Sequence, residues 1–398
     1  MLNFDVIKTV QNTIKDHNLI KPGDFVILGF SGGPDSLCLF HVLSTLSLKI
    51  GFTFFGAHIN HGIRGKEADE DAAWVIKYCQ EHGVSCIGVN ANVPLYAARR
   101  HMTEEEAGHH VRREIFSYIA YGIATGKDIS TGNNQEPLKS PAPPKHPVPK
   151  GSVKIALAHN LDDQAETVLM RILRGTGVHG LSGMKYEDRL DEALYRVAAG
   201  IKDDELKKNA KELNISVIRP LMDVPRTEIE RYCKENDLEP RIDHTNQETD
   251  YTRNKIRLEL LPFLEGGFNP NIKEALVRLA ANAAEDDSVL EKLATVEAIN
   301  SEKVLEPYRA NEKEKNSPNP APLLKTIQLD AKKLRALEPA LFKRVIVSEF
   351  EKLGLNEGIS AVHLNSLYTA VHKNVGGKTI EFPGGHTASL RAGMLTLE

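Results

Sequence analysis

The sequence contains few cysteines and no long apolar segment. Its four cysteines form no Cys-x-x-Cys pair, which argues against a structural zinc site and a disulfide framework and fits a reducing compartment. No run of about eighteen apolar residues occurs, so we expect no transmembrane helix and no membrane partner. Residues 1–19 lack the apolar core of a signal peptide. These absences predict a cytoplasmic protein and leave an organelle open.

The chain also lacks an excess of positive charge. It has 50 Lys and Arg residues against 54 Asp and Glu residues, a net charge of −4 over 398 residues. A chain with this balance does not bind nucleic acid through its overall charge, so any RNA contact must come from local basic patches. Apolar residues make up 41%, enough for sizeable cores, and the length suggests two to three domains of roughly 100–200 residues each.

Residues 25–37 have the pattern of a buried strand that turns into a helix through a glycine loop. Glycines let an anion approach the backbone amides, and a helix that starts here points free N–H groups at the loop. The pattern predicts a phosphate site formed by Ser31, Gly32, Gly33, Pro34, Asp35 and Ser36. No Gly-Lys-Ser/Thr follows, so this is not a Walker loop. A strand-to-helix turn without a ligand is the alternative.

Strand-like and helix-like patterns alternate through the first two-thirds of the chain. We expect strands over residues 25–30, 53–59, 85–90, 153–158 and 215–219, and helices over 35–48, 66–82, 103–121 and 161–174. Such alternation predicts an α/β fold with a parallel sheet and right-handed crossovers. In these sheets ligands bind outside the carboxyl ends of the strands. Polar motifs at 31–36, 58–64 and 159–166 follow three expected strands, which favours one shared site.

The pattern also predicts the division of the chain. We expect the α/β domain over residues 1–221, interrupted by a proline-rich insertion at 122–152 and a highly charged one at 186–213. Helical patterns then extend over 222–308. Prolines mark a linker at 309–325, and glycine turns between short alternating segments predict a small α+β module at 326–398.

Three carboxylates lie near the start of the expected helix at 161–174. Asp162, Asp163 and Glu166 share one face of that helix. First-turn acids and an N-cap would explain some negative charge here, because both suit the helix dipole. Three crowded carboxylates cost energy unless a cation or a metal shares them. The cluster therefore predicts a site for a cation.

A polar loop follows the strand expected at 53–59. His58, Asn60, His61 and Arg64 lie between strand residues and glycines, an arrangement that presents polar groups. Zinc would need further ligands, which the sequence does not show. The loop is better explained as one that faces a nucleotide.

Two groups of cations lie on helices. Arg171 and Arg174 end the helix at 161–174, and Arg253, Lys255 and Arg257 lie within five residues of a later helix. Cations near a helix end complement the dipole, and a charged helix face is usually solvated. The same cations could bind the phosphates of a polyanion. The residues alone leave both interpretations open.

Together these motifs resemble the tRNA(Ile)-lysidine synthetase family, within the N-type ATP pyrophosphatase (PP-loop) superfamily. The Ser-Gly-Gly-x-Asp-Ser order of residues 31–36 is shared across the superfamily. Three motifs resemble the lysidine branch: His58-x-Asn60-His61-x-x-Arg64-Gly65, Asp162-Asp163-Gln164-Ala165-Glu166-Thr167 and Arg253-Asn254-x-x-Arg257. The sequence departs at Asn160, where members often have His or Thr, and at Arg113, where Tyr usually follows the Arg that Arg112 matches.

The resemblance implies an N-type ATP pyrophosphatase domain with an adenine nucleotide alpha hydrolase-like parallel sheet. It implies that residues 222–308 bind tRNA and that the module at 326–398 recognises it. The implied reaction is that of an ATP-dependent ligase that forms a C–N bond. ATP adenylates the C2 carbonyl oxygen of the wobble cytidine in tRNA(Ile) with a CAU anticodon. Free L-lysine then displaces AMP to give lysidine, which changes the specificity from methionine and AUG to isoleucine and AUA.

The resemblance also implies roles for single residues. ATP would bind Ser31, Gly32, Gly33, Pro34, Asp35, Ser36, His58 and Asn60, and Asp35 would hold Mg²⁺. Asp35, Arg112 and Asp163 would be catalytic. Lysine would bind Asp162, Asp163 and Glu166. The tRNA would bind Arg171, Arg174, Arg253, Lys255 and Arg257, and a homodimer is expected from the family.

Other functions fit parts of the pattern. A tRNA 2-thiolation enzyme of the same superfamily would need a sulfur-carrying cysteine or an iron–sulfur site, and no Cys-x-x-Cys supplies one. An amidating synthetase that uses ammonia, of the NAD or GMP type, is a second alternative. A non-catalytic nucleotide- or RNA-binding relative is the third, and the acids at positions 35, 162, 163 and 166 argue against it.

Overall fold

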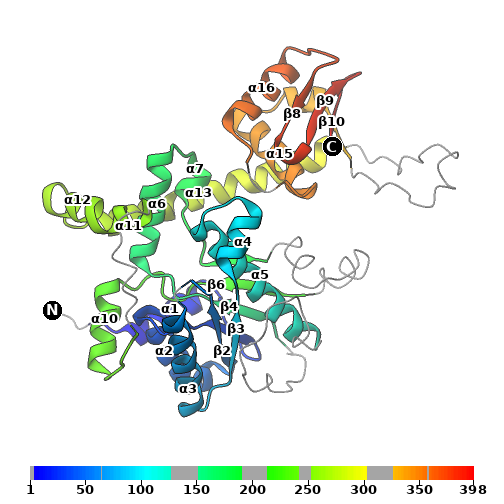
Figure 1. Cartoon of the computed structure of the whole chain (residues 1–398). Helices are drawn as coiled ribbons and strands as arrows, with labels where there is room; N and C mark the ends of the chain where they lie inside the picture. Colours follow the sequence, from blue (N-terminus) through cyan, green and yellow to red (C-terminus); the bar gives the residue numbers. More distant parts are fainter. Residues whose placement is uncertain are drawn as a thin grey trace, which may run out of the picture. The chain divides into compact units, whose positions relative to one another are not determined.

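The computed structural model describes residues 4–63, 65–126, 151–190, 213–241, 252–302, 326–355 and 358–398. These residues form two compact units, Met1–Ala281 and Asn282–Glu398, shown along the colour bar of Figure 1. Arg64, most of both expected insertions and the expected linker at 309–325 lie outside the described residues.

The first unit is built on a six-stranded sheet with the order β3-β2-β1-β4-β6-β5. Five strands are parallel: β1 (Phe25–Gly29), β2 (Thr53–Asn60), β3 (Cys86–Asn90), β4 (Val153–Ala156) and β6 (Ile215–Ile218). They confirm the predicted α/β fold with its parallel sheet. All five expected strands are present, each ending within two residues of its predicted limits.

The sixth strand was not expected from the sequence. β5 (Glu187–Arg189) pairs antiparallel with β6 at the edge of the sheet, inside the segment predicted to be a charged excursion. Its three charged residues carry no apolar alternation, which is why the pattern missed it. Lys154 of β4 donates to Glu187 Oε1 over 2.6 Å, so an ion pair fastens this strand to the sheet.

Both faces of the sheet are covered by helices. On β1, Val26 and Leu28 point into one core and Phe25 and Ile27 into the other, as the period of two requires. The first core packs against α1 (Val6–Asp16), α2 (Pro34–Ile50), α3 (Lys66–Glu81) and α10 (Arg226–Glu235). The second packs against α4 (Val93–Arg100) and α5 (Glu104–Thr125).

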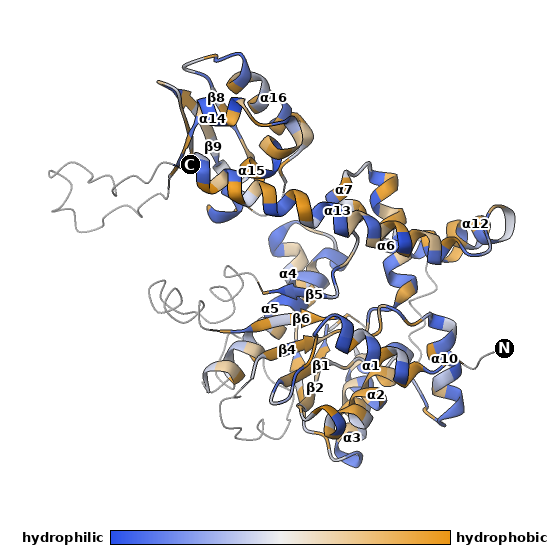
Figure 2. Cartoon of the chain, turned by 180° about the vertical axis from the view of Figure 1, so that it is seen from behind, coloured by the Kyte–Doolittle hydropathy of each residue, from blue (hydrophilic) through white to orange (hydrophobic). Residues whose placement is uncertain are grey.

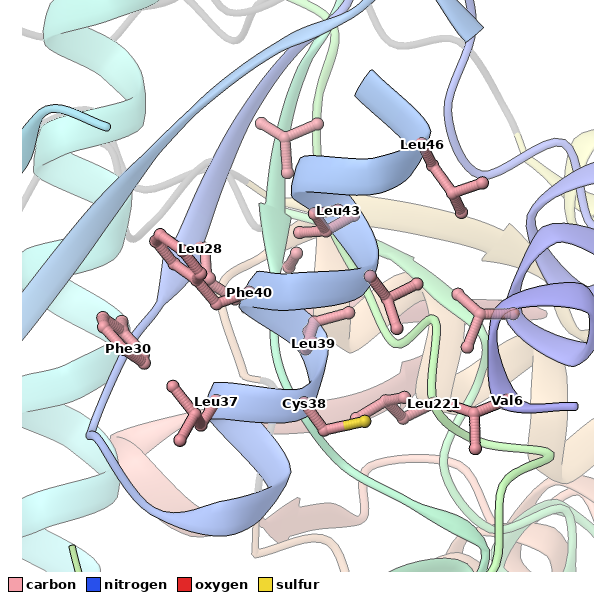
Figure 3. Close-up of a cluster of buried hydrophobic side chains, with 14 of the residues drawn as sticks. Val6, Leu28, Phe30, Leu37, Cys38, Leu39, Phe40, Leu43, Leu46 and Leu221 are labelled. Atoms are coloured by element: carbon pink, nitrogen blue, oxygen red, sulfur yellow. The ribbon is translucent and has the colours of Figure 1, made fainter. Parts of the chain in front are cut away.

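Figure 3 shows the first core around α2, where Phe40 lies beside Leu28, and Leu37 and Leu43 belong to the same cluster. The strands β1, β2 and β4 of this sheet are coloured mainly as hydrophobic in Figure 2, as expected for strands that are buried on both faces. The helix at α4 was not predicted, since its eight residues carry no clear apolar period.

Later helices of the first unit pack against α6 (Leu161–Arg174). They are α7 (Val178–Leu181), α11 (Thr252–Lys255), the π-helix η3 (Ile256–Leu260), α12 (Leu261–Gly267) and the start of α13 (Ile272–Ser301). Ala165 and Val168 of α6 share a core with Ile256, Leu261 and Leu276. The boundary between the two units falls within α13. The expectation that residues 222–308 form a separate helical domain stays a prediction.

The second unit contains a small antiparallel sheet. Its strands β7 (Ile327–Asp330), β8 (Thr379–Glu381), β9 (Thr387–Arg391) and β10 (Met394–Leu397) have the order β7-β10-β9-β8. Helices α14 (Ala331–Arg335), α15 (Pro339–Lys352) and α16 (Ala361–His372) cover it, and the 3₁₀ turn η5 (Pro383–Gly385) precedes β9. Phe342 and Phe350 are fully buried in its core. This unit confirms the predicted α+β module.

No helix among the described residues combines the length and hydropathy that crossing a bilayer requires.

Candidate active site

The site lies where the order of the sheet reverses. β1 has β2 on one side and β4 on the other, and both neighbours run parallel to it. Sheets of this class bind ligands at such a switch point, beyond the carboxyl ends of the strands. The loop after β1 leads into α2, and the loop after β4 leads into α6. Two helix N-termini, each with free N–H groups, therefore begin at the same sheet edge.

The loop before α2 strongly favours glycine at position 32. Gly32 has a φ of +86°, and a Cβ there would lie 3.1 Å from Trp74 and 3.3 Å from Val75. Ser36 Oγ accepts from the Gly32 amide over 3.1 Å and donates to the Gly33 carbonyl over 3.0 Å. These bonds hold the loop in a tight turn at the start of the helix.

Residues of α10 and of the segment that follows it bind the same loop. The Arg241 amide donates to the Gly32 carbonyl over 2.9 Å, and Cys233 Sγ donates to the Pro34 carbonyl over 3.6 Å. The Arg241 guanidinium is paired with Asp71 of α3 over 2.8 Å. No sequence pattern predicted this contact, since residues 238–241 have no spacing that indicates a partner.

Asp35 lies in the first turn of α2 and faces the second loop. Its Oδ1 accepts from Asn160 Nδ2 over 2.9 Å. Burial and the charge of Asp163 raise the pKa of Asp35 to about 6, although Arg226, the Asn160 hydrogen bond and Arg257 act in the opposite direction. A carboxyl that titrates so close to neutrality is typical of a functional site.

His58 and Asn60 are buried at the end of β2. The ring nitrogen Nδ1 of His58 lies 2.9 Å from the Phe30 carbonyl, next to the glycine loop. Asn60 donates to Asp69 over 2.8 Å and accepts from the Gly62 amide over 2.9 Å. Both side chains hold loops together at this edge of the sheet. Their contact with ATP stays a prediction.

The acidic helix α6 is capped by a reciprocal pair. Asn160 Oδ1 accepts from the Asp163 amide, and Asp163 Oδ2 accepts from the Asn160 amide, each over 3.0 Å. Asp162 accepts from the Arg226 amide over 2.8 Å and pairs with Lys273 over 2.9 Å. The cap accounts for one carboxylate oxygen of Asp163, in line with the capping role considered from the sequence. Asp162 links α6 to α10 and α13.

Two arginines of the next helical segment bind the same acids. Arg253 donates to Glu166 over 2.9 Å and to Asp163 over 2.8 Å. Arg257 donates to Glu166 over 2.5 Å and to Asp163 over 3.1 Å. Burial alone would lower the pKa of Arg257, but the hydrogen bond and charge of Glu166 raise it. Glu166 is 1% exposed, so this is a buried ion-pair network.

This network corrects one premise of the sequence interpretation. The three carboxylates do not lack a cation, because Arg253, Arg257 and Lys273 supply positive charge from within the chain. The guanidinium groups of Arg253 and Arg257 each use Nε and Nη2 for these acids, and their contact with tRNA stays a prediction. The pattern could not show this, since a solvated basic helix face and one paired with distant acids have the same spacing.

Arg171 has an internal partner as well. It donates to the Gly180 and Gly183 carbonyls over 2.9 and 2.8 Å and so holds the turn around α7. Arg174 and Lys255 are exposed, and within the described part of the chain neither has a hydrogen bond or an ion pair. Of the five cations predicted to bind tRNA, these two keep free side chains.

Two basic side chains near the acids, His159 and Arg112, were not both expected from the sequence. His159 Nδ1 is buried and has no hydrogen-bond partner among the described residues. Burial and the charges of Arg219, Arg253 and Arg112 lower the pKa of His159 to about 3, so the ring is neutral. Burial, followed by Arg253, lowers the pKa of Arg112, for which the described residues offer no ion pair. The position of His159 just after β4 was the available signal.

Comparison with known proteins fits this geometry. The sequence matches the PP-loop domain over residues 3–123 and 145–264. The chain belongs to this family. PP-loop domains bind ATP, which agrees with the glycine loop at the start of α2.

This PP-loop protein is similar to curated tRNA(Ile)-lysidine synthases. It is 40% identical to the one from Clostridioides difficile over 289 residues, which is 73% of this chain and 51% of that protein. It is 30% identical to the one from Dehalococcoides mccartyi over 376 residues, 94% of this chain and 66% of that protein. The chain thus spans about half the length of the first curated relative and two-thirds of the second.

Among solved structures, the chain is similar to the U34-tRNA thiolase NcsA from Methanococcus maripaludis. The identity is 21% and the TM-score 0.47, over 70% of this chain and 78% of that chain. This distant likeness carries no argument about function.

Proposed function

We propose that this chain forms lysidine on tRNA(Ile) with a CAU anticodon, using ATP and free L-lysine. The observation that carries the proposal is the meeting of the phosphate loop and the acidic helix at one sheet edge, joined by the Asn160–Asp35 hydrogen bond. The similarity to tRNA(Ile)-lysidine synthases names the reaction that such a pair of sites would serve.

In the first step the loop would bind the phosphates of ATP. The amides and hydroxyls of residues 31–36 would stabilise the charge that develops on pyrophosphate as it leaves. The target cytidine would attack the α-phosphorus through its C2 oxygen, so that a P–O bond to pyrophosphate breaks and an adenylated tRNA forms. The loop needs no lysine side chain for this step, whereas the Walker loop of a γ-phosphate transferase carries one.

Asp35 fits a role in holding Mg²⁺. Its Oδ1 is taken by Asn160, and no bond within the described residues occupies its Oδ2. Magnesium in nucleotide sites is bound by one or two carboxylates together with phosphate oxygens. Bound there, Mg²⁺ would neutralise phosphate charge. Asp35 would orient the nucleotide through this oxygen.

In the second step lysine would bind beside the acidic helix. Its amine attacks C2 of the adenylated cytidine, a C–N bond forms, the bond from C2 to the adenylate oxygen breaks, and AMP leaves. A carboxylate among Asp162, Asp163 and Glu166 would accept the proton that the amine loses. Because Arg253 and Arg257 already pair with Glu166 and Asp163, we assign lysine a shared place in this network instead of an uncompensated acidic pocket.

Arg112 and the neutral His159 would face the anionic parts of the reactants. Arg112 has no ion pair within the described residues, so its charge is available to the adenylate or the phosphates. His58 and Asn60 would keep the adjoining loop in place from beneath.

The tRNA would contact Arg174 and Lys255 directly. Arg171, Arg253 and Arg257 would shape that surface through their internal bonds. A tRNA-binding role for residues 222–308, recognition of tRNA by residues 326–398 and a homodimer are further parts of the proposal.

The direct test combines purified protein with ATP, Mg²⁺, labelled lysine and the CAU-anticodon isoleucine tRNA. We expect label to enter the tRNA and expect none with a methionine tRNA. Absence of both incorporation and ATP–pyrophosphate exchange would contradict the proposal. Asp35→Ala serves as the inactive control.

The thiolation alternative is tested in the same assay with a sulfur donor in place of lysine. All four cysteines are buried. Burial raises the pKa of Cys38 and Cys233, and the hydrogen bond with Cys86, followed by burial, raises the pKa of Cys79. Buried thiols with a raised pKa do not carry sulfur readily. We expect no sulfur in the product.

A further inference from the structure

We infer that Asn160 is a positioning residue that holds one oxygen of Asp35 and keeps the other available to the metal-bound phosphates. The inference rests on the proposed ATP site. It assigns Asn160 a task beyond helix capping.

The bonds of Asn160 exceed what a cap requires. A cap needs one side-chain acceptor for an amide of the first turn. Asn160 supplies this with Oδ1, which accepts from the Asp163 amide. Its Nδ2 is left over and donates to Asp35 Oδ1, a residue 125 positions away. The side chain is 1% exposed, so the amide is fixed in this orientation.

A second asparagine cap shows what capping alone looks like. Asn92 begins α4 and accepts from the Leu95 amide over 3.0 Å. Within the described residues that is its single side-chain hydrogen bond. The added bond from Asn160 to Asp35 is therefore a feature of this place in the fold and not of asparagine caps in general.

Asp35 is also distinct among the carboxylates of the site. Asp162, Asp163 and Glu166 each have both oxygens engaged by amides or cations of the chain. Asp35 has an engaged Oδ1, and no bond from the described residues reaches its Oδ2. With Oδ1 fixed, the plane of the carboxylate is fixed, and Oδ2 is preorganised for a ligand. Loss of the Asn160 donor frees that rotation.

Two substitutions separate the donor from the cap. Asn160→Ser keeps a strong N-cap and removes the amide that reaches Asp35. Asn160→Asp keeps the shape and the cap but places a carboxylate where the donor was. A hydrogen bond to a charged group is worth enough that we expect MgATP to bind about tenfold more weakly to Asn160→Ser, and more weakly still to Asn160→Asp.

Binding can be followed without catalysis. Trp74 is the sole tryptophan of the chain, and its ring lies 3.1 Å from where a Cβ of Gly32 would be. Its fluorescence should respond when nucleotide enters the loop. Titrations with MgATP and with ATP in EDTA give two dissociation constants for each variant. We expect the variants to lose affinity for MgATP and to keep that for metal-free ATP within about twofold.

The matched controls are Asn92→Ser and Asn92→Asp, which alter a cap that touches no carboxylate of the site. Thermal unfolding of all four variants measures the cost of the altered caps. If the Asn160 variants bind MgATP as the parent does, Asn160 is only a cap and the inference is overturned. If they lose MgATP and metal-free ATP equally, Asn160 shapes the loop itself, and the route through Asp35 is also overturned.

This test is independent of the lysine reaction. A parent protein that binds MgATP but forms no lysidine would contradict the proposed function and leave the role of Asn160 standing. A parent protein that binds no MgATP would contradict both.

Discussion

The ionised form of Asp35 lowers the free energy of unfolding, because burial and the charge of Asp163 disfavour it in the folded chain. Its pKa is raised from 3.8 to about 6, so between these values the folded chain binds the proton more tightly than the unfolded chain. The free energy of unfolding therefore falls as the pH rises through this window, and the whole cost is present above it. Such a cost is typical of a group placed for function.

Replacing Asp35 with Asn should stabilise the protein while it abolishes adenylation. Without nucleotide or metal, we expect a gain of about 1–3 kcal/mol near pH 8, since two pKa units correspond to roughly that energy. Near pH 3 the gain should vanish, because Asp35 is then protonated in both the folded and the unfolded state. Urea unfolding at both pH values measures the difference, and an equal gain at both would show that the charge is not its cause.

Glu166 joins stability and chemistry in one side chain. Removing it leaves two partly buried guanidinium groups without their partner, so Glu166→Ala should destabilise the protein by about 3–5 kcal/mol. Glu166→Gln keeps hydrogen-bond acceptors and should cost less. In both variants, at a temperature where they are folded, we expect ATP–pyrophosphate exchange to survive better than lysine transfer. Earlier loss of exchange would place Glu166 on the nucleotide side.

The helical segment α11–η3 acts as a clamp on α6. Arg253 and Arg257 are four residues apart, one in α11 and one in the π-helix, and both reach Glu166 and Asp163. A π-helical turn widens the backbone and is frequent at functional sites. Beside these ion pairs, Ile256 and Leu261 pack against α6 in a shared apolar core.

The clamp changes which cations should govern the salt dependence of tRNA binding. Lys255→Ala and Arg174→Ala should each lower the slope of log affinity against log salt by about 1, as expected for the loss of one phosphate contact. Arg257→Ala should leave the slope unchanged and lower the stability of the protein instead, because the Arg257 guanidinium is paired with Glu166 and Asp163. Filter binding at several salt concentrations, beside urea unfolding, distinguishes the two effects. A lower slope for Arg257→Ala would restore it to the RNA surface.

The two compact units of the molecule each have their own core. The first is organised around the six-stranded sheet, and the second around Phe342, Phe350 and a four-stranded sheet. Units with separate cores can unfold separately, and a ligand stabilises the unit that binds it.

Calorimetry of the full chain should therefore show two unfolding transitions. MgATP at about 100 times its dissociation constant should stabilise one of them by about 2.7 kcal/mol and leave the other in place. Asp35→Ala should abolish that shift. A single transition that moves as a whole with MgATP would show that the units unfold together.

Local patterns were enough to predict the framework of the protein. The apolar runs of β1, β2, β3, β4 and β6 and the amphipathic helices between them gave the α/β sheet, because burial on both faces requires continuous apolar strands. The glycine loop at residues 31–33 gave the phosphate turn, since a left-handed φ at Gly32 is a local demand. The edge strand β5 was not predicted, because an ion pair with Lys154, and not an apolar face, holds it in the sheet.

The partners of the charged side chains came from the folded chain alone. Arg257 reaches Glu166 across 91 positions, and Asn160 reaches Asp35 across 125. A basic or acidic helix face has the same sequence pattern whether water, RNA or another helix neutralises it. Spacing along one element fixes which charges share a face, while the energy of those charges depends on what the rest of the chain brings to them.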